Sequence, residues 1–454
     1  MSYATIRDRQ AHAYRAGVRL QFTGRQSAGV PSSKGIAIYR VLFIVTLILA
    51  GEMIFSLPFH TARFFRPTLL DAFGWTNTKL GDIFAVYGIT AMLAYFPGGA
   101  IADRYPARAL MTLSLLATAA GGLFMATYPT DLQMAVLYGY WGVTTIFLFW
   151  GSMVRAAREW GGDTSQGKAF GILDGGRGLA ASAVAVGAVY VLSLYLPDNA
   201  NLATDAERRL GFRTVILLYS AMTALAGLLC WIVLPKSDVS DNREPVRPPL
   251  EGMSAVIRQP IVWAQAAIII CAYCGYKGLD NYSLYAVQVL GMDEVEGARF
   301  AAYAFYTRPV AALLAGTIAD RFSASRIITI AFVGLLVSYG VLAVAIPTPP
   351  WLGLIYVNLF ATLFGVFALR ALYFALIQET GTPANMTGTT VGMVSFIGYT
   401  PEVFFAAVGG RILDNAPGVA GHHHYFMFLA GTAALGLVAV VWLMRLNRRA
   451  SPNG

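Results

Sequence analysis

The chain has 454 residues, of which 57% are hydrophobic and 13% are charged, and its formal net charge is +9. So small a charged fraction argues against a soluble globular protein. The basic excess is concentrated in the tails and in alternate loops, which fits membrane topology better than a nucleic-acid-binding face. The three cysteines lie inside apolar runs, and we interpret them as free thiols that pack as small apolar side chains.

Many apolar runs are long enough to cross a bilayer as a helix, which takes about 20 residues. Alternating segments typical of a barrel are absent, so helices are the expected spanning elements. We place twelve spans at roughly 37–59, 79–101, 108–128, 132–156, 168–195, 212–234, 260–289, 298–319, 326–347, 351–378, 386–410 and 424–446. The sequence therefore predicts an all-α membrane protein with twelve transmembrane helices.

The loop charges predict the orientation of these spans. The N-terminal tail is strongly basic, the loops that follow even-numbered spans are basic, and the opposite loops are more acidic or mixed. The positive-inside rule then puts both termini in the cytoplasm. Arg63 and Arg66, in the expected outer loop after the first span, run against this trend. The run from His422 to His424 is expected to be solvated in the last outer loop.

A Gly-x-x-x-Asp-Arg pattern occurs twice, close to half the chain apart, and each copy stands between two apolar runs. A Gly-x-x-x-Gly spacing opens both the fifth span (Gly167 to Gly171) and the eleventh (Gly388 to Gly392), where it would let helices approach closely. The polar, Pro-rich stretch 236–259 reads as a linker. We therefore predict a cytoplasmic tail 1–36, a six-helix bundle 37–235, a cytoplasmic linker 236–259, a second six-helix bundle 260–446 and a tail 447–454.

The repeated pattern resembles the signature of the major facilitator superfamily, a resemblance that covers about residues 37–446. The matching residues are Gly99, Asp103, Arg104 and Arg108 in the first copy, and Gly316, Asp320 and Arg321 in the second. Pro106 and Ser323 replace a glycine of the signature, and Arg326 is displaced by one position. The resemblance implies two pseudo-symmetric bundles and a conformational latch, in which Asp103 pairs across the cytoplasmic seam. The alternative is that the arginines only anchor the loop inside.

The fifth span lacks the proline of the antiporter motif that drug exporters of this superfamily carry, which favours uptake or exchange of a solute. The segments around the fifth and eleventh spans resemble the organophosphate or organic-anion and the nitrate/nitrite porter branches. The full Gly-rich nitrate signature is missing.

Charges inside spans are costly, so each is a candidate functional residue. Arg177 and Arg308 lie near the midplane in opposite halves, and we predict that they bind a negatively charged group of the solute. Lys277 and Arg370 are further candidates for substrate binding. The alternatives are structural: a local pair of Arg177 with Asp174, a local pair of Lys277 with Asp280, an acid on the seventh span for Arg308, and snorkelling of Arg370.

Glu52, Asp280 and Glu402 are predicted to couple protons, because a carboxylic acid in a low-dielectric cavity binds protons more readily. Glu402 follows Pro401 in a stretch that predicts a bent helix. The competing interpretation is that these acids are structural partners of buried arginines.

The sequence therefore predicts a secondary active transporter that moves a small organic anion across the inner membrane by alternating access. An organophosphate, a sugar acid or another carboxylate would serve, with coupling to protons or exchange against a counter-anion. The alternatives are a proton-driven exporter of drugs or amphiphiles and a non-transporting membrane sensor. No metal, nucleophile or nucleotide motif is present, so we expect no catalytic residue, metal or cofactor and no nucleic-acid partner. We expect a monomer in the lipid bilayer.

Overall fold

The structure described here is a computed structural model that describes residues 33–162, 166–236, 256–380, 384–416 and 418–450. Residues 1–42 and 43–454 form two separate compact units. Of the first unit the structure describes only residues 33–42, which begin helix α2 (Ser33–Met53). Throughout the described residues the regular secondary structure is helical, without a strand.

Nine helices among the described residues are long and apolar enough to cross a membrane, or eleven if each of two bent pairs counts as one span. The short helices α14 and α15 together cover the remaining predicted span. The bounds in the first half are η1 Ser56–His60, α3 Thr61–Phe64, α4 Arg66–Phe73, α5 Asn77–Arg104, α6 Ala107–Met125, α7 Asp131–Gly142, η2 Val143–Trp150, α8 Gly151–Gly161, α9 Gln166–Ser193, η3 Ala200–Leu202 and α10 Asp205–Val233.

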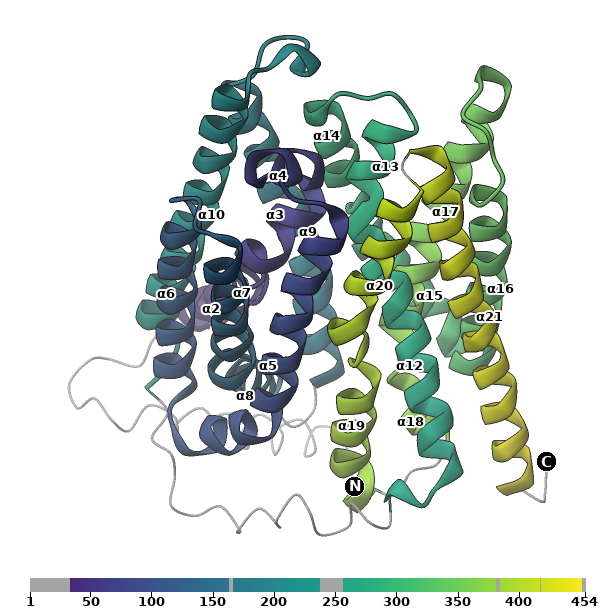
Figure 1. The fold of residues 1–454 in the computed structure, drawn as a ribbon. Coiled ribbons are helices and arrows are strands. Elements are labelled where there is room, and N and C mark those ends of the chain that lie inside the picture. Colours follow the sequence, from purple (N-terminus) through teal and green to yellow (C-terminus); the bar gives the residue numbers. More distant parts are fainter. Residues whose placement is uncertain (1–32, 163–165, 237–255, 381–383, 417, 451–454) are drawn as a thin grey trace, which may run out of the picture. The chain divides into compact units, whose positions relative to one another are not determined.

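The second half contains α12 Pro260–Gly278, η4 Leu279–Asn281, α13 Tyr282–Gln288, α14 Glu294–Ala304, α15 Thr307–Phe322, α16 Ala324–Leu342, α17 Pro349–Leu372, α18 Ala375–Glu379, α19 Ala384–Gly398, α20 Pro401–Asn415 and α21 Val419–Ala450. These helices lie beside those of the first half, α3 to α10 (Figure 1). The arrangement is consistent with the predicted twelve spans.

The two halves repeat each other in detail. Helices α6 and α16 begin and end at positions that differ by 217 residues, the separation that also relates Arg63 to Asp280. The same offset relates Gly74 to Gly291, the left-handed residues (φ 67° and 72°) just before α5 and α14. Because identical offsets run through helices and turns alike, the halves are two copies of one structural unit.

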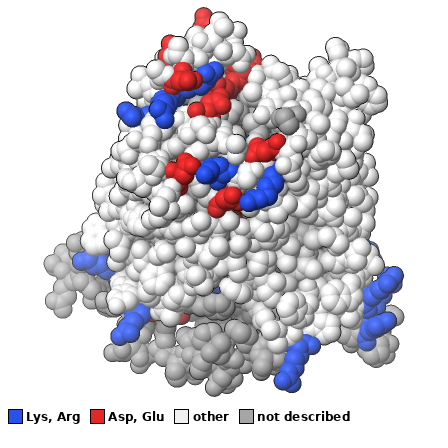
Figure 2. Space-filling model, viewed as in Figure 1, with Lys and Arg blue, Asp and Glu red and all other residues white. Residues whose placement is uncertain are grey.

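We name two sides of this unit. The motif side carries the turns between α5 and α6 and between α15 and α16, together with the end of α21, and the α4 side lies opposite with α4, α13 and α14 (Figure 1). On the face in Figure 2, mainly basic groups mark the motif-side edge, whereas acidic and basic groups mix towards the α4 side.

The halves meet closely on the α4 side, where α5 packs against α20. A Cβ on Gly81 would lie 2.3 Å from the Ala406 carbonyl oxygen, and one on Gly88 would lie 2.4 Å from that of Glu402. Only glycine allows the two backbones this approach. At Gly171 and Gly392, where the sequence predicted close approach, no described atom lies within 4 Å of an added Cβ, so that prediction is wrong for these two positions.

The polar residues assigned to two outer loops are helical instead. Arg63 lies in α3 and Arg66 in α4, with only 3% and 2% of their surfaces exposed. Their partners, Asp280 and Asn77, cannot be found from the local sequence. The three histidines begin α21, where His422 is buried against Gln288 (3.0 Å). The predictions of loops at these positions are therefore wrong.

The predicted domain boundaries remain predictions. Residues 1–32 of the N-terminal tail, 237–255 of the linker and 451–454 of the C-terminal tail lie outside the described residues.

Candidate functional site

A cavity lies between helices of the two halves and holds about 900 Å³ of empty space, counted with its opening. Gly88 and Glu402, which form the close contact of α5 with α20, also line the cavity. This contact therefore closes the cavity towards the α4 side. The charged residues that line it are Glu52, Arg63, Arg177, Lys277, Arg370 and Glu402.

One group of charges, which we call the Glu52 cluster, comprises Glu52, Asp174, Arg177 and Arg308. Arg177 Nε lies 3.1 Å from Glu52 Oε2, and Arg308 lies 3.8 Å from Glu52 and 2.6 Å from Asp174. Arg308 therefore crosses from the second half to two acids of the first. A Cβ on Gly178 would lie 2.9 Å from Arg308 Cδ, so glycine makes room for this side chain.

The Glu52 cluster brings the two predicted midplane arginines together, but on a carboxylate. Arg177 lines the cavity, whereas Arg308 is buried behind it and is not among the residues that line it. Asp174 pairs with Arg308, and not with Arg177 as the structural alternative proposed. His60 Nε2 also lies 3.1 Å from Glu52.

A second group, the Lys277 cluster, comprises Arg63, Lys277, Asp280 and Glu402. Arg63 Nε lies 2.5 Å from Asp280, and Lys277 Nζ lies 3.1 Å from Asp280 and 3.2 Å from Glu402. The predicted local pair of Lys277 with Asp280 is confirmed, and the structure adds two further partners. The hydroxyl of Tyr273 donates to Glu402.

Two breaks in the helices position this cluster. Helix α12 ends at Gly278 and a 3-10 turn follows, which brings Asp280 beside both cations. Helix α19 ends at Gly398 and α20 begins at Pro401, as the predicted bend required. Glu402 therefore lies at the start of α20, facing the cavity.

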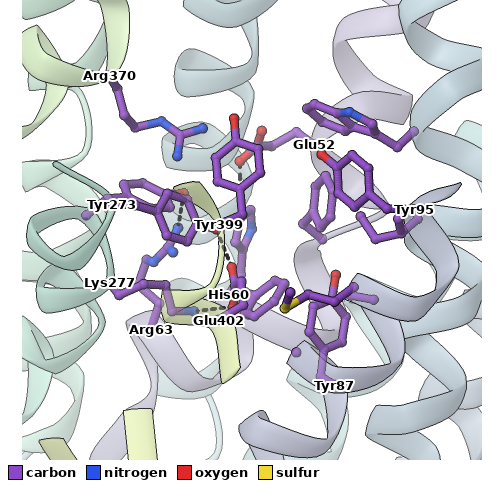
Figure 3. Close-up of a pocket in the computed structure, with 18 of the residues that line it drawn as sticks. Glu52, His60, Arg63, Tyr87, Tyr95, Tyr273, Lys277, Arg370, Tyr399 and Glu402 are labelled. Atoms are coloured by element: carbon purple, nitrogen blue, oxygen red, sulfur yellow. Dashed lines mark hydrogen bonds and ion pairs between the residues drawn. The ribbon is translucent and has the colours of Figure 1, made fainter. Parts of the chain in front are cut away.

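Arg370 is the exception among the cations that line the cavity. Its guanidinium lies 4.0 Å from the centre of the Tyr276 ring and 6.0 Å from that of Tyr273, and no carboxylate of a described residue pairs with it. Figure 3 shows this guanidinium pointing into the cavity, apart from the Glu402–Lys277 pair. Arg63 lies over the same Tyr276 ring at 4.8 Å.

Aromatic side chains supply most of the remaining wall. Those from the first half are Phe55, Phe59, Tyr87, Tyr95 and Trp150, and those from the second are Tyr273, Tyr276, Phe396 and Tyr399. Tyr95 and Tyr273 lie on opposite sides of the cavity in Figure 3. The cavity is therefore an aromatic chamber with charged groups at defined points.

The predicted latch residues lie at the motif-side ends of α5 and α15 and at the start of α6, outside the cavity lining. Arg108 lies 4.2 Å from the centre of the Trp231 ring. Asp103 is exposed and makes no ion pair with a described residue, while the surroundings of the Asp320 side chain lie outside what the structure describes. The latch role of Gly99, Asp103, Arg104, Arg108, Gly316, Asp320 and Arg321 stays a prediction.

Sequence reasoning missed Arg63 and His60 as members of the site and gave Asp174 only a local structural role. The two halves held a usable signal for Arg63. Once the copies of the repeat are aligned by their offset of 217 residues, Arg63 occupies the position of Asp280 and His60 that of Lys277. For Asp174 no comparable signal exists, because the same offset relates it to Val391, an uncharged residue.

A family model described as Major Facilitator Superfamily matches residues 41–406. The chain belongs to this superfamily. Its relatives include the inner membrane protein YqcE of Escherichia coli K12, 30% identical over 375 residues that make up 81% of this chain and 85% of YqcE. The probable nitrate/nitrite antiporter NarK1 of Thermus thermophilus is 26% identical over 60% of this chain and 59% of its own length.

Solved structures show the same fold. The nucleoside transporter NupG aligns with a TM-score of 0.66 at 13% identity, covering 90% of this chain and 99% of that one. The predicted superfamily and the all-α membrane fold of two related bundles are thereby confirmed. Membership of this superfamily makes the chain a transporter and not an enzyme.

Proposed function

We propose that this transporter moves a small organic anion through the cavity by alternating access, and that Arg370 binds the negative group of the solute. One observation carries the proposal. Arg63, Arg177 and Lys277 each have a carboxylate partner, whereas Arg370 faces the cavity with none among the described residues.

The energetics favour an anionic ligand at this position. Arg370 is only partly exposed, so its unpaired charge loses part of its hydration, and the contact with Tyr276 offsets only about 0.5–2 kcal/mol of that cost. A carboxylate can accept two parallel hydrogen bonds from one guanidinium, which is the geometry arginine offers. A bound anion would therefore complete the site.

This proposal changes the roles of the other candidate ligands. Arg177 and Lys277 line the cavity but hold carboxylates, so they would assist binding only after those carboxylates are neutralised or move. Arg308 would position Glu52 and Asp174 from behind the wall.

Glu402 is the candidate that best supports proton coupling. It lines the cavity with 14% of its side chain exposed, compared with 3% for Glu52 and 6% for Asp280. A proton on Glu402 would leave Lys277 with one carboxylate instead of two. The cavity would then gain one positive charge, so a proton and an anion would favour each other's binding. Exchange of anions, supported by the similarity to NarK1, needs no such step.

The membrane and the orientation are part of the proposal. YqcE is an inner membrane protein, and we propose the same location for this chain. The basic residues on the motif side support a cytoplasmic motif side and cytoplasmic termini. The structure, closed on the α4 side, would then correspond to a state closed to the outside.

The test is uptake into proteoliposomes of labelled organic anions, with and without an imposed pH gradient. We expect Arg370→Gln to abolish uptake and Arg370→Lys to retain part of it, because lysine keeps the charge but loses the paired donors. Arg258→Gln, an exposed arginine outside the cavity, is the control. Transport at the wild-type rate by Arg370→Gln would overturn the proposal.

The same assay separates the alternatives. An exporter of cationic amphiphiles needs an unpaired acid in the cavity, but both cavity acids, Glu52 and Glu402, have cationic partners. A sensor would bind an anion tightly without moving it across the bilayer.

A further inference from the structure

We infer that the solute carries a single negative charge and that its other polar groups are neutral hydroxyls, as in a sugar-sized monocarboxylate. This inference rests on the proposed function and narrows it. It comes from the charges of the cavity wall, the hydrogen-bonding groups that remain open there, and the shape of the aromatic walls.

The net charge of each cluster follows from the ionised groups that it contains. The Glu52 cluster contains two carboxylates and two guanidiniums, joined by contacts of 2.6 to 3.8 Å. The Lys277 cluster contains two carboxylates, one guanidinium and one ammonium, joined by contacts of 2.5 to 3.2 Å. Each cluster is therefore neutral with its acids ionised.

His60 lies beside the Glu52 cluster, and its protonation state also affects the net charge of the cavity wall. Its Nε2 lies 3.1 Å from Glu52, while its buried Nδ1 has no hydrogen-bond partner in the part of the chain that the structure describes. A protonated imidazole would need an acceptor at both nitrogens. We therefore assign a neutral ring that donates from Nε2 and adds no charge.

The positive charge that remains in the cavity wall belongs to Arg370. With both clusters neutral, Arg370 leaves the described wall with one net positive charge. A solute with one negative charge cancels it. With Glu402 ionised, a second negative charge would find no free cation among the described residues of the wall and would be held in a poorly solvated site at a cost of several kcal/mol. A phosphate monoester carries about −1.5 to −2 at pH 7 and is disfavoured for this reason.

Glu402 and Lys277 lie at the end of the cavity away from Arg370 (Figure 3). Glu402 Oε2 is buried and has no hydrogen-bond donor in good geometry among the described residues, although Lys277 Nζ lies 3.2 Å away. Glu402 nevertheless lines the cavity with 14% of its side chain exposed, so a solute hydroxyl can donate to its carboxylate, whose charge the ammonium group balances. A charged group here would be repelled by one member of the pair.

The space between these two ends of the cavity is shaped by its side walls. Aromatic rings from both halves flank it, with Tyr95 opposite Tyr273 (Figure 3). Aromatic faces pack well against the C–H groups of a sugar skeleton and leave its hydroxyls at the edges. The whole arrangement fits a polyhydroxylated carbon chain or ring with one carboxylate.

The experiment compares four six-carbon probes by isothermal titration to purified, reconstituted full-length protein. Gluconate has one carboxylate and many hydroxyls, glucarate has two carboxylates, glucitol has none, and hexanoate has one carboxylate without hydroxyls. We expect gluconate to bind about tenfold more tightly than each of the others, or better.

Each alternative result has a definite meaning. Equal or tighter binding of glucarate or hexanoate overturns this inference and leaves the organic-anion proposal standing. Binding of glucitol as tight as that of gluconate overturns both. Failure of all four probes to bind overturns the inference, and the uptake assay with other anions then decides the proposed function.

Variants of Arg370 test the charge argument directly. In Arg370→Gln we expect gluconate to lose its advantage over glucitol, so that the two bind within about threefold of each other. Arg258→Gln should keep the full difference. If Arg370→Gln weakens gluconate and glucitol equally, the arginine only shapes the cavity and the inference fails.

Discussion

Asp414 joins the two halves at the α4 side by capping a helix that belongs to the other half. Its carboxylate accepts hydrogen bonds from the backbone N–H of Asn77 (3.2 Å), from the side chain of Asn77 (3.0 Å) and from the backbone N–H of Thr78 (2.6 Å). The two backbone N–H groups are first-turn donors of α5, which have no partner inside their own helix. The Thr76 side chain takes only the third, Lys79 N–H.

The equivalent helix of the second half needs no such help. Helix α14 has a complete capping box, in which Asp293 and Glu296 satisfy the first turn from adjacent residues. The cap on α5 is therefore a contact between halves that exists only while the α4 side is closed. We predict that Asp414→Ala shifts the protein towards a state open on that side.

The magnitude follows from the hydrogen bonds and the charge that this substitution removes. Loss of a helix cap costs about 0.5–2 kcal/mol, and loss of a negative charge at a helix N-terminus costs about 0.3–1 kcal/mol more. A total of about 2 kcal/mol changes the ratio of closed to open molecules by roughly 30-fold. Asp414→Asn keeps one acceptor oxygen and should shift the ratio by only about fivefold.

The assay is a distance measurement between spin labels on the α4 side. Leu202 in the first half and Ile346 in the second are both exposed there and suit labelling. The three native cysteines would be replaced by alanine. Double electron–electron resonance in lipid nanodiscs should show a longer-distance population that grows from wild type to Asp414→Asn to Asp414→Ala.

Asp198→Ala is the matched control, because Asp198 is exposed on the same side and makes no interaction with a described residue. It should leave the distance distribution unchanged. The reasoning is refuted if Asp414→Ala also leaves it unchanged while folding normally, because the cap would then contribute nothing to closure.

Three further predictions follow from the same structure. Gly88→Val should force α5 from α20 and abolish transport, whereas Gly187→Val, at an open position, should transport normally. Glu402→Gln should make uptake insensitive to a pH gradient while anion exchange persists; retained gradient-driven uptake would exclude Glu402 as the coupling group. Asp280→Asn should destabilise the protein by about 3 kcal/mol, seen as a lower melting temperature than that of Asp198→Asn, because Arg63 and Lys277 lose their shared acid.

The sequence alone was sufficient to predict the membrane-spanning helices of this protein and its two related halves. Apolar runs of bilayer length predicted the helices, and the doubled pattern at Asp103 and Asp320 predicted two related halves. Both depend on local composition and on repetition along the chain, which a sequence displays directly. The pair of Lys277 with Asp280 was predictable for the same reason, because residues three apart share a helix face.

Only the tertiary structure decided which charges of the described cavity wall pair and that Arg370 has no carboxylate partner there. From the sequence, Arg177 and Arg308 were the leading solute ligands and Arg370 a lesser one. In the structure Arg177 and Arg308 both pair with Glu52, whereas Arg370 faces the cavity. The physical reason is that an ion pair depends on a few ångströms between helices far apart in the chain. No spacing within the sequence encodes that distance.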